Sequence, residues 1–162
     1  MKIILASKNQ DKIKEIKKIL DSTDLMLVTC NDVDIPEVEE TGSTFVENAI
    51  LKARSASLTT GLASIADDSG IEVDYLNAQP GIKSARFSGL NSTNESNNLK
   101  LLKALDGVPY EKRGACYRCV IVYMRFPDDP FPIITSGSWK GYITEELTGT
   151  NGFGYDLSLI HI

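Results

Sequence analysis

The sequence has 162 residues, 42% of them hydrophobic, which suits one globular domain with a sizeable core. A formal net charge of −5 argues against a nucleic-acid polymer as the main partner. No apolar run approaches the roughly 20 residues that span a bilayer, and at the N-terminus the apolar stretch is too short and a charge follows too early for a secretory signal. We therefore expect a cytoplasmic protein without a membrane partner.

The first half of the chain alternates apolar segments with helical patterns. A strand is expected at Lys2–Ala6, and a helix follows whose apolar residues share one face. These residues are Ile13, Ile16, Ile19 and Leu20. An extended segment at residues 25–30 then leads into an acidic loop at residues 34–42. The next helix should begin at Thr44, which stands three residues before Glu47 in the spacing of a capping box, and it has a suitable glycine stop in Gly61.

The second half begins with "ASIADDSGIEVDYL", which predicts a buried strand, a tight turn at Ser69–Gly70 and another strand. A loop at residues 81–98 precedes a helix that carries Leu99, Leu102 and Leu105. Later strands are expected near Ala115–Arg125, Phe131–Thr135 and Trp139–Thr144. Strands that alternate with helices and then meander predict an α/β fold with a mixed sheet.

The cysteines Cys30, Cys116 and Cys119 are an odd number, which suits a reducing compartment. The motif "CYRC" could indicate zinc or redox chemistry. It lies in a predicted strand, however, where residues three apart point to opposite faces, and there is no second ligand pair. We therefore expect buried strand cysteines.

The turn "ASKNQDK" could bind phosphate, because a helix start with lysines nearby favours anions. It has no glycine and is not a P-loop, so an ordinary turn with solvated lysines is the alternative. "ADDSG" places Asp67 and Asp68 at the end of an apolar strand, where a metal ion or a general-base role would compensate for their burial. A simple D-S-G turn is the alternative, and if the segment is extended the two side chains diverge.

Two further segments could complete a nucleotide site. The acidic residues Glu37, Glu39 and Glu40 could add metal ligands, although such clusters are usually solvated loops. In "NGFGYD", glycines would let the backbone approach a ligand, and Phe153 or Tyr155 could stack on a base or instead pack into the core. Together these features predict a site that binds a nucleotide and magnesium, but they do not identify the reaction.

Four sequence motifs say more about the function than the spacing of single residues does. "LASKNQDKIKEI", "EETGSTFVENAILKA", "ADDSGIEVDYLNAQPGIKSARFSG" and "GTNGFGYD" occur in the order found in the inosine triphosphate pyrophosphatase family. The chain resembles bacterial members of this family, which hydrolyse dITP and XTP, over Lys2 to Asp156. The resemblance implies an elongated α/β mixed-sheet fold with two lobes flanking a central nucleotide-binding cleft, usually in a homodimer.

The resemblance also implies a role for particular residues. Asp68 matches the proton acceptor and a Mg²⁺ ligand, and Glu40 is the second metal candidate, ahead of Glu37 and Glu39. The matching substrate-binding positions are Ser7, Lys8, Asn9, Gln10, Asp11, Lys12, Lys52, Ser69, Phe153, Gly154, Tyr155 and Asp156. The implied reaction is attack of water on the α-phosphorus of ITP, dITP or XTP, which releases pyrophosphate and a nucleoside monophosphate.

The resemblance ends after Asp156, where relatives continue with a further stretch that helps to read the base. We expect a single pyrophosphatase domain at residues 1–156, incomplete at its C-terminus. Residues 157–162, "LSLIHI", resemble the translation of a transposase-end sequencing adapter, so we expect an artefact there, and His161 does not match the family's base-reading histidine.

Two other interpretations of the sequence are possible. The septum-formation-inhibitor-like nucleotide pyrophosphatases carry an S-x-R-R element in the first turn, where this chain has "SKNQDK". A nucleotide-binding module without turnover is the alternative from another class, because the C-terminal motif is missing. Release of pyrophosphate from ITP would separate a catalyst from a binder.

Overall fold

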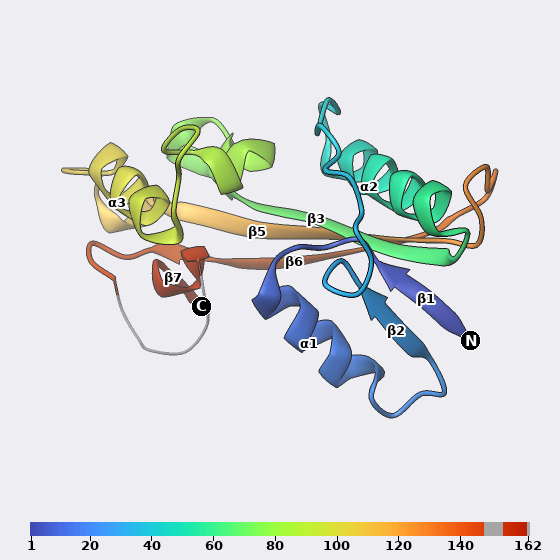
Figure 1. Ribbon diagram of the computed structural model, residues 1–162. Helices are drawn as coiled ribbons and strands as arrows, with labels where there is room; N and C mark the ends of the chain where they lie inside the picture. The colour runs from blue at the N-terminus through green and yellow to red at the C-terminus, as the bar shows by residue number, and fades with distance from the viewer. Residues whose placement is uncertain (148–153, 162) are drawn as a thin grey trace. The chain divides into compact units, whose positions relative to one another are not determined.

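The computed structural model describes residues 1–147 and 154–161 (Figure 1). Its strands form a sheet with the order β2-β1-β3-β5-β6-β7, and β4 pairs with β3. Strand β1 is parallel to both β2 and β3, whereas the β3–β4 and β6–β7 pairs are antiparallel. The predicted α/β class with a mixed sheet is therefore confirmed.

The elements have the following bounds. The strands are β1 (Lys2–Leu5), β2 (Met26–Thr29), β3 (Ala63–Val73), β4 (Gln79–Pro80), β5 (Gly114–Met124), β6 (Ile133–Ile143) and β7 (Leu159–His161). The α-helices are α1 (Gln10–Leu20), α2 (Phe45–Thr60) and α3 (Asn94–Ala104). Short 3₁₀ helices are η1 (Asp74–Leu76), η2 (Gly81–Arg86), η3 (Tyr110–Lys112) and η4 (Gly154–Leu157). No helix within the described ranges is long and apolar enough to cross a bilayer.

The chain divides into two compact units. The first unit contains Met1–Asp68 and Val120–Ser136, and the second contains Ser69–Cys119 and Gly137–Ile162. In the first unit, α1 and α2 lie on opposite sides of β3 (Figure 1). The core of this unit includes the fully buried Ala49 and Ala53 of α2, which pack with Val122 and Met124. Small side chains on α2 allow the helix to lie close to the sheet.

Helix α2 begins and ends as predicted. The Thr44 hydroxyl accepts a hydrogen bond from the Glu47 amide at 3.3 Å, and the Glu47 carboxylate accepts from the Thr44 amide at 2.9 Å. Hydrogen bonds to its carboxylate lower the pKa of Glu47, and the bond from the Thr44 side chain has the largest effect. Gly61 closes the helix at φ +68°, a left-handed conformation that favours glycine, and its amide donates to the Ser57 carbonyl at 2.8 Å.

Three predicted boundaries were wrong. The tight turn expected at Ser69–Gly70 does not form, because β3 runs without interruption from Ala63 to Val73. The two strands expected near Phe131–Thr135 and Trp139–Thr144 are the single strand β6. Strand β3 has neighbours on both sides, and sheet hydrogen bonding outweighs the local turn preference of Ser-Gly.

The third wrong boundary is the start of α3, which begins inside the segment predicted to be a loop. Thr93 caps the helix, and Leu101 is fully buried. Of the three leucines expected on this helix, Leu99 is 55% exposed, whereas Leu105 is fully buried and Leu102 packs against the core. The neighbouring Asn97 and Asn98 are also buried, and buried asparagines are not part of an apolar pattern, so the sequence pattern did not show this part of the buried face.

The strand cysteines were predicted to be buried, which holds for Cys116 and only in part for Cys119. All three cysteines of the chain are free thiols. Burial raises the pKa of Cys30, so this thiol is not activated as a thiolate.

A buried carboxylate stabilises the turn between β5 and β6. Asp129 accepts hydrogen bonds from the Arg125 amide at 3.0 Å, from the Arg125 guanidinium at 2.8 Å and from the Phe131 amide at 3.0 Å. The Arg125 guanidinium holds the pKa of Asp129 well below its usual range. A carboxylate whose pKa is lowered on folding stabilises the protein above the ordinary aspartate pKa, and this contribution is lost as the pH falls through the folded-state value.

We expect Asp129→Asn to lower the melting temperature at pH 7, because the turn loses its charge-assisted hydrogen bonds. The difference from the parent should shrink as the pH is lowered below the ordinary aspartate pKa, since Asp129 of the unfolded parent then binds a proton while the folded carboxylate stays ionised. Melting curves at pH 7 and in increasingly acidic buffers test this. The matched control is Asp128→Asn, a change at the exposed preceding residue. An equal loss in both variants would contradict the assigned role of Asp129.

Candidate active site

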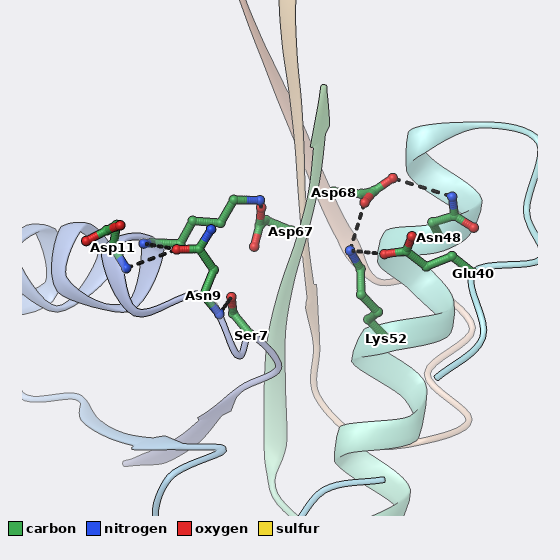
Figure 2. Close-up of polar contacts among 9 residues, drawn as sticks. Ser7, Asn9, Asp11, Glu40, Asn48, Lys52, Asp67 and Asp68 are labelled. Atoms are coloured by element: carbon green, nitrogen blue, oxygen red, sulfur yellow. Dashed lines mark hydrogen bonds and ion pairs between the residues drawn. The ribbon is translucent and has the colours of Figure 1, made fainter. Parts of the chain in front are cut away.

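Two neighbouring aspartates near the middle of β3 define the site. Asp67 and Asp68 are both buried, with 5% and 7% of their surface exposed. Figure 2 shows that their side chains point to opposite faces of the strand, Asp67 towards α1 and Asp68 towards α2. The expected divergence of the two side chains is confirmed, and its cause is the two-residue period of a strand. Each carboxylate therefore belongs to a different set of partners.

The Asp68 side shares one ammonium group between two carboxylates. Lys52 Nζ, from α2, donates to Asp68 Oδ1 at 2.8 Å and contacts Glu40 Oε1 at 3.2 Å (Figure 2). These side chains are mostly shielded from solvent, so their charges are only weakly screened. The structure thus brings together three residues proposed for the site from separate segments.

Asn48 completes this group and was missed in the sequence analysis. Its Oδ1 accepts a 2.8 Å hydrogen bond from the Gly42 amide, which directs its Nδ2 towards Asp68 Oδ2 at 3.5 Å. Gly42 must be glycine here, because an added Cβ would lie 2.6 Å from Asn48 Oδ1. A signal was present in the sequence: Asn48 and Lys52 are four residues apart and share one helix face.

Burial raises the pKa of Asp68 above the ordinary aspartate value. The Lys52 ammonium opposes this rise, whereas the nearby Glu40 carboxylate adds to it. A carboxylate with a raised pKa binds a proton more strongly than an ordinary one. Asp68 is thus chemically suited to accept a proton.

The Asp67 side contains the first turn. Lys12, in the first turn of α1, forms an ion pair with Asp67 Oδ2, and the Asp67 side chain is only 6% exposed. Asn9 caps α1, since its Oδ1 accepts hydrogen bonds from the Asp11 amide at 3.0 Å and from the Lys12 amide at 3.2 Å. The amides of Asp11 and Lys12, which could have bound an anion, therefore already donate to an acceptor within the protein. The positive end of the α1 dipole can still attract an anion.

The other residues of the turn make surface contacts. The Ser7 hydroxyl accepts from the Asn9 amide at 3.3 Å, and Lys8 pairs with Glu37 at 3.7 Å. Gln10 exchanges amide hydrogen bonds with Asn31, and Asp11 pairs with Lys14 at 3.3 Å. The contact of Glu37 is thus with Lys8, whereas Glu40 contacts Lys52.

The predicted base-binding segment is described only from Gly154 onwards, and Phe153 lies outside the described residues. Tyr155 is 5% exposed and belongs to the core of the second unit, together with Leu101 and Leu105. Its hydroxyl donates to the Ser84 carbonyl at 2.9 Å, and burial raises its pKa. Of the two alternatives left open for this ring, the structure supports packing into the core over stacking on a base. Ser69 continues β3 beyond Asp68 as a partly buried residue of the second unit.

The donors at Asp68 suit a hard divalent ion. The described residues contain no cluster of three or more metal-ligating side chains of the His, Cys, Asp or Glu type. A protein that binds magnesium together with a nucleotide needs only one or two carboxylates, because phosphate oxygens and water supply the rest. Glu40 and Asp68 already share one cationic group, Lys52 Nζ, so the pair fits such an ion.

The chain is similar to known proteins in sequence and in fold. The sequence profile of the Ham1 family matches residues 3–161. A dITP/XTP pyrophosphatase from Thioalkalivibrio sulfidiphilus is 53% identical over 156 residues, which are 96% of this chain and 80% of that protein.

Solved structures show the same fold. A HAM1 protein from Coxiella burnetii superposes with a TM-score of 0.90 at 43% identity. The superposed region is 98% of this chain and 81% of the Coxiella chain. A nucleoside-triphosphatase, dITP/XTP pyrophosphatase, from Mycobacterium abscessus gives a TM-score of 0.82 at 41% identity, with coverage of 99% and 84%. On the profile match, the sequence identity and the shared fold, the chain belongs to the Ham1 family.

Proposed function

We propose that the chain is a hydrolase that converts ITP, dITP and XTP to the nucleoside monophosphate and pyrophosphate. The observation that carries this proposal is the contact of one ammonium group, Lys52 Nζ, with both Asp68 and Glu40. The curated relatives, named dITP/XTP pyrophosphatases, support the substrate class. Removal of such nucleotides would cleanse the nucleotide pool.

The raised pKa of Asp68 suits it to take the proton of the water that attacks the α-phosphorus. Lys52 holds the carboxylate in place and supplies positive charge for the phosphate groups. Glu40 and Asp68 would hold Mg²⁺, which neutralises charge on the phosphate oxygens when it is bound. Asn48 fixes the loop before α2 and so limits the movement of Glu40 and Asp68.

The first turn supplies a second cation. Lys12 is partly buried against Asp67, so its position is fixed before a substrate arrives. We propose that the turn Ser7–Lys12 contacts the triphosphate, with Lys12 and the positive end of α1 attracting it. The segment Phe153–Asp156 and Ser69 would contact the nucleoside part of the substrate.

We also propose four general properties of the protein. They are a single pyrophosphatase domain at residues 1–156, a homodimeric assembly, a cytoplasmic location and Mg²⁺ as the metal ion.

The test of function is pyrophosphate release by the purified chain. With Mg²⁺ present, we expect release from ITP, dITP and XTP. Asp68→Asn is the control for contaminating activity. Saturable binding of ITP with no release of pyrophosphate would instead identify a binding module.

Lys12→Ala should raise KM for ITP by an amount equivalent to about 1.5–3 kcal/mol, the usual range for hydrogen bonds to charged groups. Steady-state kinetics measure this. Asp67→Asn is the matched control, because it weakens the same ion pair but keeps the cation. If both variants raise KM equally, the ion pair supports the fold of the turn and Lys12 does not contact phosphate.

A further inference from the structure

The second unit contains a side chain that fixes the segment proposed to contact the base. Asn98 lies on α3 and is only 2% exposed. Its Nδ2 donates to the Gly154 carbonyl at 2.7 Å and to the Asn94 carbonyl at 3.0 Å. Its Oδ1 accepts a hydrogen bond from the Ser158 hydroxyl. One buried amide thus joins a helix to both ends of η4.

The backbone of this segment has further attachments. The Ser158 amide donates to the Tyr155 carbonyl at 2.9 Å, and the Thr144 amide donates to the Ser158 carbonyl at 2.8 Å. The Tyr155 ring is held in the core, and its hydroxyl reaches the Ser84 carbonyl at 2.9 Å. Apolar packing holds the ring, whereas the polar contact at Gly154 comes from Asn98.

Gly154 is the point at which this polar contact matters most. It has φ +61°, a left-handed conformation that favours glycine, and it directly follows Phe153 in the sequence. A partly buried carbonyl that loses its donor costs free energy, so removal of the Asn98 amide would drive Gly154 to find another partner. The residues around Gly154 would then shift.

We infer that Asn98 is a positioning residue for recognition of the nucleobase. It acts through Gly154 and Ser158 and does not itself touch the substrate. The inference rests on the proposed function, since that function assigns base contacts to Phe153–Asp156. It predicts that Asn98 affects binding of the base and leaves binding of the phosphates unchanged.

The neighbouring Asn97 provides a matched control. It is of the same residue type on the same helix and is 4% exposed. Its amide accepts from the Ser88 amide at 2.7 Å and donates to the Ala85 carbonyl at 3.1 Å, so its contacts are with residues before α3. Asn97→Leu and Asn98→Leu each remove a buried polar side chain, and only the second removes the contact with Gly154.

The experiment measures the dissociation constants of ITP and of inorganic tripolyphosphate by calorimetry, for the parent, Asn97→Leu and Asn98→Leu. We expect Asn98→Leu to weaken ITP binding by about tenfold, comparable to the loss of one to two hydrogen bonds, and to leave tripolyphosphate binding unchanged. Asn97→Leu should bind both ligands like the parent. Ser158→Ala removes one partner of Asn98 and should give a smaller loss of the same kind, and it serves where Asn98→Leu does not fold.

The inference is overturned if Asn98→Leu, or Ser158→Ala in its place, binds ITP like Asn97→Leu, or if ITP and tripolyphosphate weaken together. Pyrophosphate release by the parent is measured separately. If the parent binds ITP without release, the proposed function fails while the comparison of dissociation constants still tests Asn98. If the parent does not bind ITP, both proposals fail.

Discussion

Asp68→Asn is expected to lower kcat for ITP by about 10²–10⁴-fold, the range typical of the loss of a general base. The substitution keeps the size of the side chain and removes its charge and its ability to accept the proton. Steady-state kinetics with saturating Mg²⁺ provide the measurement.

The same variant should fold at least as well as the parent. Burial raises the pKa of Asp68, so the folded state disfavours the ionised form, and ionisation reduces stability as the pH rises above the ordinary aspartate pKa. The neutral amide removes this cost, while Lys52 retains Glu40 as a partner. We therefore expect an unchanged or higher melting temperature at pH 7.

Asp67→Asn is the matched control for this prediction, because it makes the same chemical change one residue away, on the other face of β3. It should keep most of kcat. Near-normal turnover in Asp68→Asn, or an equal loss in both variants, would falsify the assignment of Asp68 as the proton acceptor.

Lys52→Met is expected to lower kcat/KM by about 100-fold and to destabilise the protein at the same time. Methionine is of similar length but lacks the ammonium group that contacts both Asp68 and Glu40. Loss of a charge-assisted contact to the substrate accounts for the kinetic effect. Breaking a fully buried ion pair costs about 3–5 kcal/mol, so a cost of about 1–3 kcal/mol is reasonable for these partly shielded groups.

A double variant separates the two effects of this change. In Lys52→Met, two carboxylates face each other without their shared cation. Adding Glu40→Gln removes one of these charges and should restore part of the melting temperature. Activity should stay low, because the cation for the phosphates and a metal ligand are both absent. Recovery of activity together with stability would show that Lys52 is needed only for folding.

Local sequence patterns predicted the elements whose causes are local. The capping box at Thr44 and the glycine stop at Gly61 depend on a few adjacent residues, and both have the expected hydrogen bonds. The opposite orientations of Asp67 and Asp68 follow from strand geometry alone. The family motifs identified which residues of the sequence are candidates for the site, and they implied the fold class.

Tertiary structure decided the remaining features. Ser69–Gly70 has a strong local turn preference, yet it lies inside β3, because a strand that is part of a sheet gains more from its pairing than a turn would provide. Tyr155 could have stacked on a base, and its burial in the core depends on α3 and the rest of the second unit.

The ion pairs of the site depend on the same kind of information. Lys52 contacts Glu40, twelve residues away, and Asp68, sixteen residues away, and Lys12 reaches Asp67 across fifty-five residues. The sequence by itself determined which residues carry charge and which local structure each one occupies. Only the packing of α1 and α2 against β3 decided which charges meet, because a buried charge must take its partner from whatever the fold places beside it.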